Sequence, residues 1–233
     1  MLTLILAESA LETIPKSLWK HSSVVHHAEK RGKHPEFILL DRSYHHTAMK
    51  TLKDNEKRGR PDIVHFALLE ALSSPLNKEG LLQVYVHTFN DYVITIAPET
   101  RLPRNYNRFI GLVEQLFKFR KIPQTGHVLL TVKKQSLPQL LQTVKPTYVL
   151  VFSRKGKKCT LENAISMLSS KEKSAAIVGG FPHGHFSEKT SKLANETIAV
   201  DPEMLETWTV ISRLIYEYER TISLSTKRIR TRI

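Results

Sequence analysis

Short apolar runs alternate with longer segments of helical period along almost the whole of this 233-residue chain. A short apolar run bounded by polar residues is typical of a buried strand, whereas apolar residues at three- and four-residue steps indicate an amphipathic helix. The runs that we expect to form strands lie at 2–6, 37–40, 82–87, 92–97, 128–132, 148–152, 175–178 and 197–200. Because strands and helices alternate, the pattern predicts an α/β fold with a largely parallel sheet flanked by helices.

Helices are expected between these strands and after the last of them. The segments with apolar residues at helical spacing are 63–72, 107–119, 136–143, 160–168 and 188–194. A longer helix is predicted to begin at Pro202 and to be capped by Asp201, since Pro is favoured at the first helical position and Asp before it. Its apolar stripe runs from Leu205 to Ile222.

One domain accounts for this pattern, because the chain has no internal repeat and no evident linker. The pair Asn90-Asp91 separates two alternating runs and predicts a β-hairpin, which we interpret as part of an insertion at about 81–104. The last segment, 225–233 (STKRIRTRI), is short and basic, and we expect it to form a loose tail after a domain over 1–224.

The charge of the chain indicates its class of partner. Lys and Arg number 35 against 22 Asp and Glu, so the formal net charge is +13. An excess of this size favours nucleic acid first and an anionic membrane surface second, and we expect no membrane association. No apolar run reaches the roughly 18–20 residues that cross a bilayer, and the N-terminus lacks the layout of a signal peptide. With a single Cys159, which excludes a disulfide framework within one chain, a cytoplasmic protein is expected.

No metal site or hydrolytic arrangement is visible. Histidines are concentrated between residues 21 and 46, at His21, His26, His27, His34, His45 and His46. Their spacing matches no zinc motif and no Cys assists them, so we expect polar residues, some near bound RNA, and no metal. Neither a Ser/His/Asp spacing nor a pair of carboxylates suggests a catalytic group.

The segment 177–186 (IVGGFPHGHF) is the first candidate site. An apolar strand runs directly into Gly179-Gly180, and Gly184 follows. Glycines at the carboxyl end of a strand let the backbone approach a ligand, and α/β sheets place their sites at such ends. The pattern is neither GxGxxG nor a P-loop. A tight turn that only joins a strand to a helix would look the same.

Arginines form the second candidate. Arg101, Arg104 and Arg108 are interleaved with Tyr106 and Phe109, and such a group can bind phosphates and stack on unpaired bases. A solvated charged loop is the alternative.

The third candidate is the segment 58–62 (RGRPD), which precedes an expected helix. Its Asp62 suits either the helix N-terminus or an ion pair that orients Arg60 toward a phosphate or a base.

Five segments together resemble one family. They are RGRPDIVHFALLEALSSPLN at 58–77, RLPRNYNRFIGLVEQL at 101–116, YVLVFSRKG at 148–156, VGGFPHGHF at 178–186 and IAVDPEMLETWTVISRLIYEYE at 198–219. In this combination the chain resembles the archaeal ribosome-biogenesis pseudouridine N1-methyltransferases of the SPOUT (α/β-knot) superfamily. The resemblance covers nearly the whole chain. It implies a deep trefoil knot at about 147–220, an exception to the rule that connections do not thread loops, and a homodimer whose RNA surface uses both subunits.

The resemblance also implies the site residues. S-adenosylmethionine would bind in the knot, with contacts from Phe152, Gly179, Gly184, Thr197, Ile198, Ala199, Val200, Asp201 and Leu205. Trp208 would either line the same slot or pack in the core. Small-subunit ribosomal RNA would be held by Arg60, Arg101, Arg104 and Arg108, with Asp62 steadying Arg60.

The implied reaction transfers a methyl group to N1 of a pseudouridine in small-subunit ribosomal RNA and releases S-adenosylhomocysteine. Pseudouridine exposes an N1–H that uridine lacks. No general base is identified, and Asp62 is the one carboxylate to test, although orienting Arg60 is its expected role. Two alternatives stay open: an RNA-binding assembly factor or chaperone without catalysis, and a knotted methyltransferase that acts on another RNA.

Overall fold

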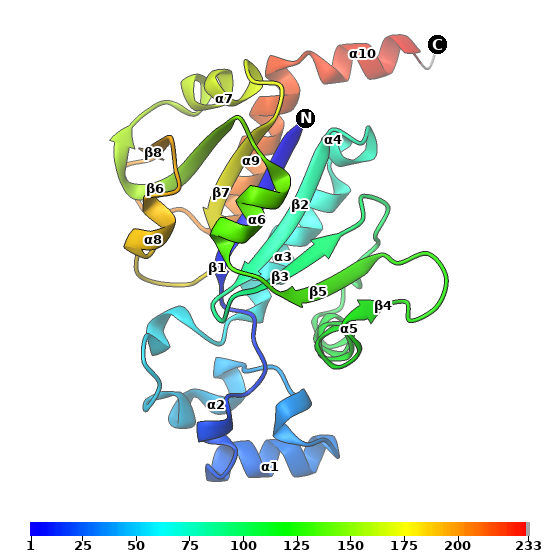
Figure 1. The fold of residues 1–233 in the computed structure, drawn as a ribbon, viewed down its shortest axis with the longest axis vertical. Helices are drawn as coiled ribbons and strands as arrows, with labels where there is room; N and C mark the ends of the chain where they lie inside the picture. Colours follow the sequence, from blue (N-terminus) through cyan, green and yellow to red (C-terminus); the bar gives the residue numbers. More distant parts are fainter. Residues whose placement is uncertain (232–233) are drawn as a thin grey trace.

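The computed structural model describes residues 1–231, in which eight strands form one mixed sheet (Figure 1). The strand order is β4-β5-β3-β2-β1-β7-β6-β8. The strands are β1 (Leu2–Ser9), β2 (Leu82–Thr88), β3 (Tyr92–Ile96), β4 (Lys121–Ile122), β5 (Leu130–Lys134), β6 (Tyr148–Lys158), β7 (Ser174–Gly179) and β8 (Glu196–Ala199). From β2 to β8 the neighbours are parallel, and from β2 to β4 they are antiparallel. The predicted α/β class is confirmed, and the sheet is parallel in one part only.

Helices cover both faces of the sheet, so its inner strands are apolar on both sides. The helices that follow the first strand region are α3 (Pro61–Ser73), α4 (Pro75–Lys78), α5 (Tyr106–Phe119), α6 (Leu137–Val144), α7 (Leu161–Ser169), α8 (Glu188–Ser191), α9 (Thr207–Thr221) and α10 (Leu224–Thr231). Leu4 of β1 packs in the core shared with α3, α7 and α9, while Ile5 packs in the core shared with α6. Alternate residues of a strand face opposite sides, which explains why β1 is buried along its whole length.

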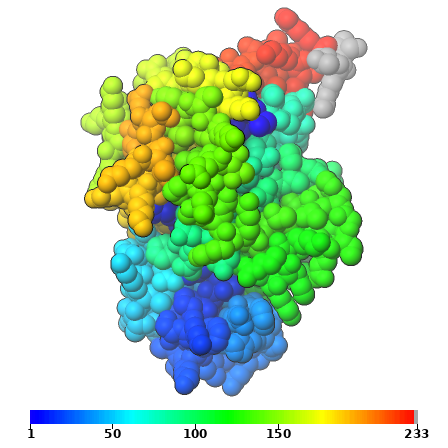
Figure 2. Space-filling view, in the orientation of Figure 1, coloured from blue at the N-terminus to red at the C-terminus, as the bar shows by residue number. Residues whose placement is uncertain are grey.

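Between β1 and α3 the chain leaves the sheet and forms a helical unit, which we define as residues 10–60. It contains α1 (Ser22–Arg31), α2 (Arg42–Met49) and the short 3₁₀ helices η1 (Lys16–Leu18), η2 (Pro35–Phe37) and η3 (Asn55–Lys57). Its own apolar core includes Val24, Ile38 and Met49. The unit projects from the lower end of the sheet as a separate lobe (Figures 1 and 2).

The expected strand at 37–40 is wrong. Phe37 ends η2, and Leu39 makes only an isolated antiparallel bridge to Thr13. This run is apolar because Ile38 and Leu40 fill the core of the helical unit, not because it joins the sheet.

The hairpin around Asn90-Asp91 is confirmed, since β2 and β3 pair with His87 opposite Val93. Both strands belong to the main sheet, where β2 lies directly beside β1.

Two expectations for the C-terminal part are wrong. The last long helix begins at Thr207, not at Pro202, because the Thr207 hydroxyl donates to the Gly179 carbonyl at 2.7 Å and holds the helix start at the end of β7. Asp201 therefore caps no helix and instead accepts from the Glu203 N–H at 2.9 Å. The expected loose tail is helical as far as it is described, in α10, and residues 232–233 lie outside the described residues.

Candidate functional site

A cavity of about 480 Å³ lies at the carboxyl ends of β7 and β8, beside residues 152–154 in the middle of β6. This is the edge of the sheet where α/β folds place their ligand sites, and the volume suits a small molecule. Residues within 152–154 of β6, 178–186 at the end of β7 and 198–207 at the end of β8 form its walls, with Val210 of α9. Of the residues expected at the cofactor, it is lined by Phe152, Gly179, Gly184, Ile198, Ala199, Val200, Asp201 and Leu205.

Two expected wall residues lie elsewhere. Thr197 pairs with Val151 inside the sheet and is not among the lining residues, whereas its neighbour Ile198 is. The Trp208 ring packs against the half-exposed Phe66 of α3, with ring centroids 5.4 Å apart, so Trp208 lies neither in the cavity wall nor in the buried core.

The cavity has further walls that sequence reasoning missed. Phe181 and Phe186 meet edge to face at 5.3 Å, and both line it. Besides the expected Asp201, two further carboxylate residues line it, Glu203 and Glu206, in a chain whose net charge is strongly positive. The aromatic residues could have been found from the sequence, because they lie inside the glycine-rich motif. The carboxylates could not, because a helix was expected from Pro202 onward.

The glycine loop needs its glycines for two different reasons. Gly180 packs on β1, where a Cβ would overlap the Ser9 side chain, and its N–H donates to the Ala7 carbonyl at 3.0 Å. Gly184 lines the cavity with φ at +90°, a conformation that side chains disfavour. The first glycine joins the loop to the sheet, and the second shapes the cavity wall.

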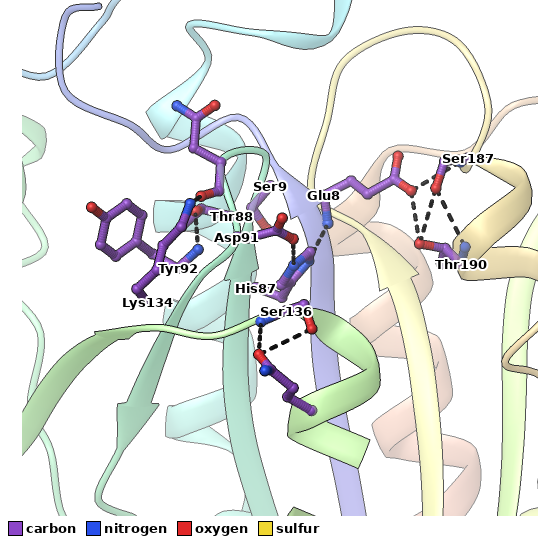
Figure 3. Close-up of polar contacts among 12 residues, drawn as sticks. Glu8, Ser9, His87, Thr88, Asp91, Tyr92, Lys134, Ser136, Ser187 and Thr190 are labelled. Atoms are coloured by element: carbon purple, nitrogen blue, oxygen red, sulfur yellow. Dashed lines mark hydrogen bonds and ion pairs between the residues drawn. The ribbon is translucent and has the colours of Figure 1, made fainter. Parts of the chain in front are cut away.

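Glu8 anchors the far end of the same loop (Figure 3). Its carboxylate accepts from the Ser187 N–H at 2.9 Å and from the Thr190 hydroxyl at 2.8 Å, and it pairs with the Lys57 ammonium at 3.0 Å. Lys57 also donates to the His185 carbonyl. Burial alone would raise the pKa of Glu8, but these hydrogen bonds outweigh burial and lower that pKa below its ordinary value. Nothing in the sequence indicated this anchor, because Glu8 is 179 positions from Ser187.

The two arginines of the RGRPD segment have different surroundings. Arg58 is buried and binds Glu12 through two contacts of 2.7 Å, so it is a structural residue of the helical unit. Arg60 is about one-third exposed and binds Asp62 through Nε–Oδ1 and Nη2–Oδ2 contacts of 2.8 and 2.6 Å. These hydrogen bonds raise the pKa of Arg60, and the carboxylate of Glu206 raises it further. Since Glu206 lines the cavity, the Arg60–Asp62 pair lies within electrostatic reach of it.

The other three predicted RNA-binding arginines are exposed on one continuous segment. Arg101 and Arg104 precede α5, and Arg108 lies in its first turn. His65 of α3 binds the Pro103 carbonyl at 2.7 Å and stacks on Phe109 of α5 at 4.3 Å. These contacts hold the segment against α3, the helix that Arg60 precedes. The fold thus brings the arginines to the N-terminal ends of two packed helices.

The histidines of the helical unit serve local structure. His21 and His34 accept backbone N–H groups at the starts of α1 and η2, and His27 binds His45 at 2.9 Å. Within residues 1–231, no three His, Cys, Asp or Glu residues gather as a metal site. The helices of the same range include none that is long and apolar enough to cross a membrane.

Known proteins resemble this chain over nearly its full length. A family model described as EMG1/NEP1 methyltransferase matches residues 4–219. The Thermococcus sibiricus "Ribosomal RNA small subunit methyltransferase Nep1" is 49% identical over 222 residues, which cover 95% of this chain and 99% of the relative. The Pyrococcus furiosus protein of the same name is 46% identical over 218 residues, 94% of this chain and 96% of that one.

A solved structure agrees in fold as well as in sequence. The crystal structure of Archaeoglobus fulgidus Nep1 bound to S-adenosylhomocysteine matches with a TM-score of 0.84 and 41% identity, covering 95% of this chain and 98% of that chain. The match includes the strands that form the cavity and the segments that carry the arginines. This chain belongs to the EMG1/NEP1 methyltransferase family of the SPOUT superfamily.

Proposed function

We propose that this protein uses S-adenosylmethionine to methylate N1 of a pseudouridine in small-subunit ribosomal RNA, in ribosome biogenesis. The observation that carries the proposal is the cavity at the ends of β7 and β8, beside β6, in a chain whose relative of known structure holds S-adenosylhomocysteine. The names of the relatives support the choice of RNA.

The residues of the cavity fit this cofactor. Phe152, Ile198 and Leu205 give it an apolar part that suits an adenine ring. Asp201, Glu203 and Glu206 give it an acidic part, which suits a ligand that carries a sulfonium and an ammonium group. When bound, the cofactor supplies an electrophilic methyl group.

On the RNA side, the arginines position the target. Arg101, Arg104 and Arg108 are exposed and free to contact phosphates, while Arg60 is held in a fixed direction by Asp62. The base must leave its stack to reach the cavity. As the bond from N1 to the methyl carbon forms, the carbon–sulfur bond breaks and N1 loses its proton. Both oxygens of Asp62 already accept from Arg60, so we assign Asp62 a positioning role rather than that of the proton acceptor.

The same proposal includes the architecture that the resemblance implies. The apolar core that contains Leu2 of β1 and Leu224 of α10 also takes in Leu11 and Leu39 of the helical unit, which supports a single domain over 1–224. The order β1-β7-β6-β8 and the link from Thr207 back to Gly179 support a trefoil knot at about 147–220. Phe66 of α3 and Tyr216 of α9 are 49% and 67% exposed, and such apolar side chains support a homodimer. A cytoplasmic location is part of the proposal.

Labelled S-adenosylmethionine and two RNA hairpins test the reaction. The hairpins have the same small-subunit sequence, one with pseudouridine and one with uridine at the target. Methyl incorporation is expected only into the pseudouridine hairpin. Tight binding of both hairpins without incorporation into either would instead support an RNA-binding assembly factor, and incorporation into both would indicate a methyltransferase of different specificity.

A further inference from the structure

A second cavity, of about 300 Å³, lies outside the cofactor cavity, between the helical unit and the first turns of α5. We call it the α1–α5 pocket. Its lining residues are His27, Arg31, Leu39, Asp41, Tyr44, Tyr106, Asn107 and Ile110. Asn107 directly precedes Arg108, so the pocket adjoins the segment of exposed arginines. None of its residues has a role in the cofactor cavity.

The pocket has an aromatic wall. His27 and Tyr44 are stacked, with ring centroids 4.2 Å apart and an angle of 14° between the rings. His27 is only 8% exposed, whereas Tyr44 is 52% exposed. Leu39 and Ile110 add apolar surface. An exposed aromatic ring over an apolar hollow is the usual surface on which proteins stack an unpaired base.

Hydrogen bonds fix which ring nitrogen of His27 carries its proton. The Asp41 N–H donates to His45 Nδ1 at 3.1 Å, so His45 carries its own proton on Nε2. Burial lowers the pKa of His45 to about 4 and also lowers the pKa of His27, so both rings are neutral at pH 7. His45 Nε2–H therefore donates to His27 Nδ1 at 2.9 Å, and His27 carries its proton on Nε2. This hydrogen bond also fixes the His27 ring against which Tyr44 stacks.

The charges around the pocket favour a neutral ligand with acceptor groups. The Asp41 carboxylate already accepts from the Tyr106 hydroxyl at 2.6 Å and the Ser43 N–H at 2.8 Å. Arg31 is paired with the buried Glu114 at 2.8 Å. The Asp41 carboxylate opposes a phosphate and Glu114 already holds Arg31, while the amide of Asn107 can donate to the carbonyl of a base.

We propose that the α1–α5 pocket binds an unpaired base of the RNA, a neighbour of the target nucleotide in the same loop. This inference rests on the proposed function and deepens it. The base would stack on the face of Tyr44 that His27 does not cover, and one of its carbonyl oxygens would accept from the Asn107 amide. Tyr106 lies between this pocket and α3, because its hydroxyl donates to Asp41 and its ring centroid is 6.0 Å from that of His65. An RNA strand that follows the arginines from Arg60 to Arg108 would pass both places.

A double-mutant cycle between protein and RNA tests the pocket. The probes are the pseudouridine hairpin and a set of copies in which one loop nucleotide at a time is abasic, and the readout is the Kd without cofactor. Tyr44→Ala is expected to weaken binding of the intact hairpin about 10-fold, as loss of one stacked base does. With the abasic site at one particular loop position, Tyr44→Ala should cause no further loss. Tyr44→Phe should keep the affinity.

Matched variants separate the pocket from general effects. Phe119→Ala removes a 43% exposed ring at the other end of α5, and Gln115→Ala removes an exposed amide on the same helix. Both are expected to leave the Kd within about 2-fold of wild type. Asn107→Ala should repeat the coupling at the same loop position with a smaller loss. Because Asn107 is exposed, it serves as the second variant if thermal unfolding shows that Tyr44→Ala has not folded.

The outcomes distinguish this inference from the function it rests on. Losses that add at every loop position, for Tyr44→Ala and for Asn107→Ala, would overturn the pocket. Methylation of the hairpin without such coupling would overturn the pocket alone. Coupling in a protein that transfers no methyl group would support the pocket and contradict the proposed reaction. Failure of the wild-type protein to bind the hairpin would contradict both.

Discussion

The cavity end of the sheet and the helical unit are built in different ways. At the cavity, the ends of β7 and β8, the middle of β6 and a glycine-rich loop define the site, and the residues that shape it lie within short stretches of sequence. In the helical unit, the geometry depends on buried polar pairs between distant residues, such as Glu12 with Arg58 and Arg31 with Glu114. The lining of the cavity therefore comes from short stretches of sequence, with Glu8 as a long-range anchor, whereas long-range charge pairing positions the predicted RNA surface.

Glu114 shows how the second region is held. Its side chain is buried on α5 and accepts from Arg31 at 2.8 Å, from Lys33 at 2.6 Å and from the Leu39 N–H at 3.3 Å. All three partners belong to the helical unit. This one carboxylate joins the unit to the helix whose first turn carries Arg108. Removing such pairs should disturb stability and RNA binding, while changes at the cavity should leave both intact.

The largest expected effect is on the Glu12–Arg58 pair. Glu12→Ala leaves the buried Arg58 guanidinium without its partner, which should lower the free energy of unfolding by about 3–5 kcal/mol. Urea denaturation measures this change. The control is Glu188→Ala, which removes an exposed pair with Lys192 and should have no measurable effect. Equal stability of Glu12→Ala and wild type would contradict the claim that this buried pair holds the helical unit together.

Acid should weaken the helical unit through His45. Burial lowers its pKa from 6.5 to about 4, so the unfolded chain binds the proton more readily than the folded one. The stabilisation is complete above pH 6.5 and is lost as the pH falls toward 4, by about 3 kcal/mol. Denaturation at a series of pH values tests this. In His45→Gln, the part of the pH dependence of the unfolding free energy that is due to His45 should disappear. An unchanged pH dependence would refute the assignment of this effect to His45.

At the cavity, Gly179→Leu should separate the two regions. A Cβ at Gly179 would already meet the Phe181 ring at 2.9 Å, so a larger side chain fills the cavity. Affinity for S-adenosylhomocysteine, measured by calorimetry, should fall about 100-fold, or about 2.7 kcal/mol, with methylation lost in step. The Kd for the RNA hairpin should stay within about 3-fold of wild type. A comparable loss of RNA binding would show that the regions are not independent.

A smaller effect is expected where the regions meet. Asp62→Asn keeps the shape of the side chain but weakens its hold on Arg60, so RNA affinity should fall about 10-fold. The pH profile of methylation should keep its form. If Asp62 were the proton acceptor, the variant would instead lose activity by orders of magnitude at unchanged RNA affinity. Arg60→Lys is the matched variant at the partner of Asp62, because it retains the positive charge and loses the bidentate contact.

The features that the sequence predicts correctly are those that depend on local sequence, and the features it misses depend on contacts between distant residues. The expected hairpin, the helices at α3 and α5 and most of the cavity wall are found, because each depends on local periodicity or on glycine at a strand end. The run 37–40 was misassigned because burial in a separate helical core and burial in a sheet leave the same apolar pattern. The start of α9 was misassigned because Thr207 is fixed by a bond to Gly179, 28 positions away.

The polar anchors were beyond prediction for the same reason. Glu8 reads as an ordinary acidic residue after an apolar strand, yet it holds Ser187, Thr190 and Lys57. The sequence indicated only polar residues at His27 and His45, and their mutual hydrogen bond depends on the packing of α1 on α2. For Asp62 the sequence left two roles open, at the helix N-terminus or in an ion pair with Arg60. The bidentate contact to Arg60 shows the ion pair.

The most direct test of the proposed reaction is to identify the methylated atom. The pseudouridine hairpin is incubated with enzyme and S-adenosylmethionine, digested to nucleosides, and analysed by liquid chromatography and tandem mass spectrometry against synthetic standards. The account predicts 1-methylpseudouridine as the product from this hairpin and no methylated nucleoside from the uridine hairpin. A methyl group on N3, on the ribose 2′-oxygen or on any other nucleotide would contradict it.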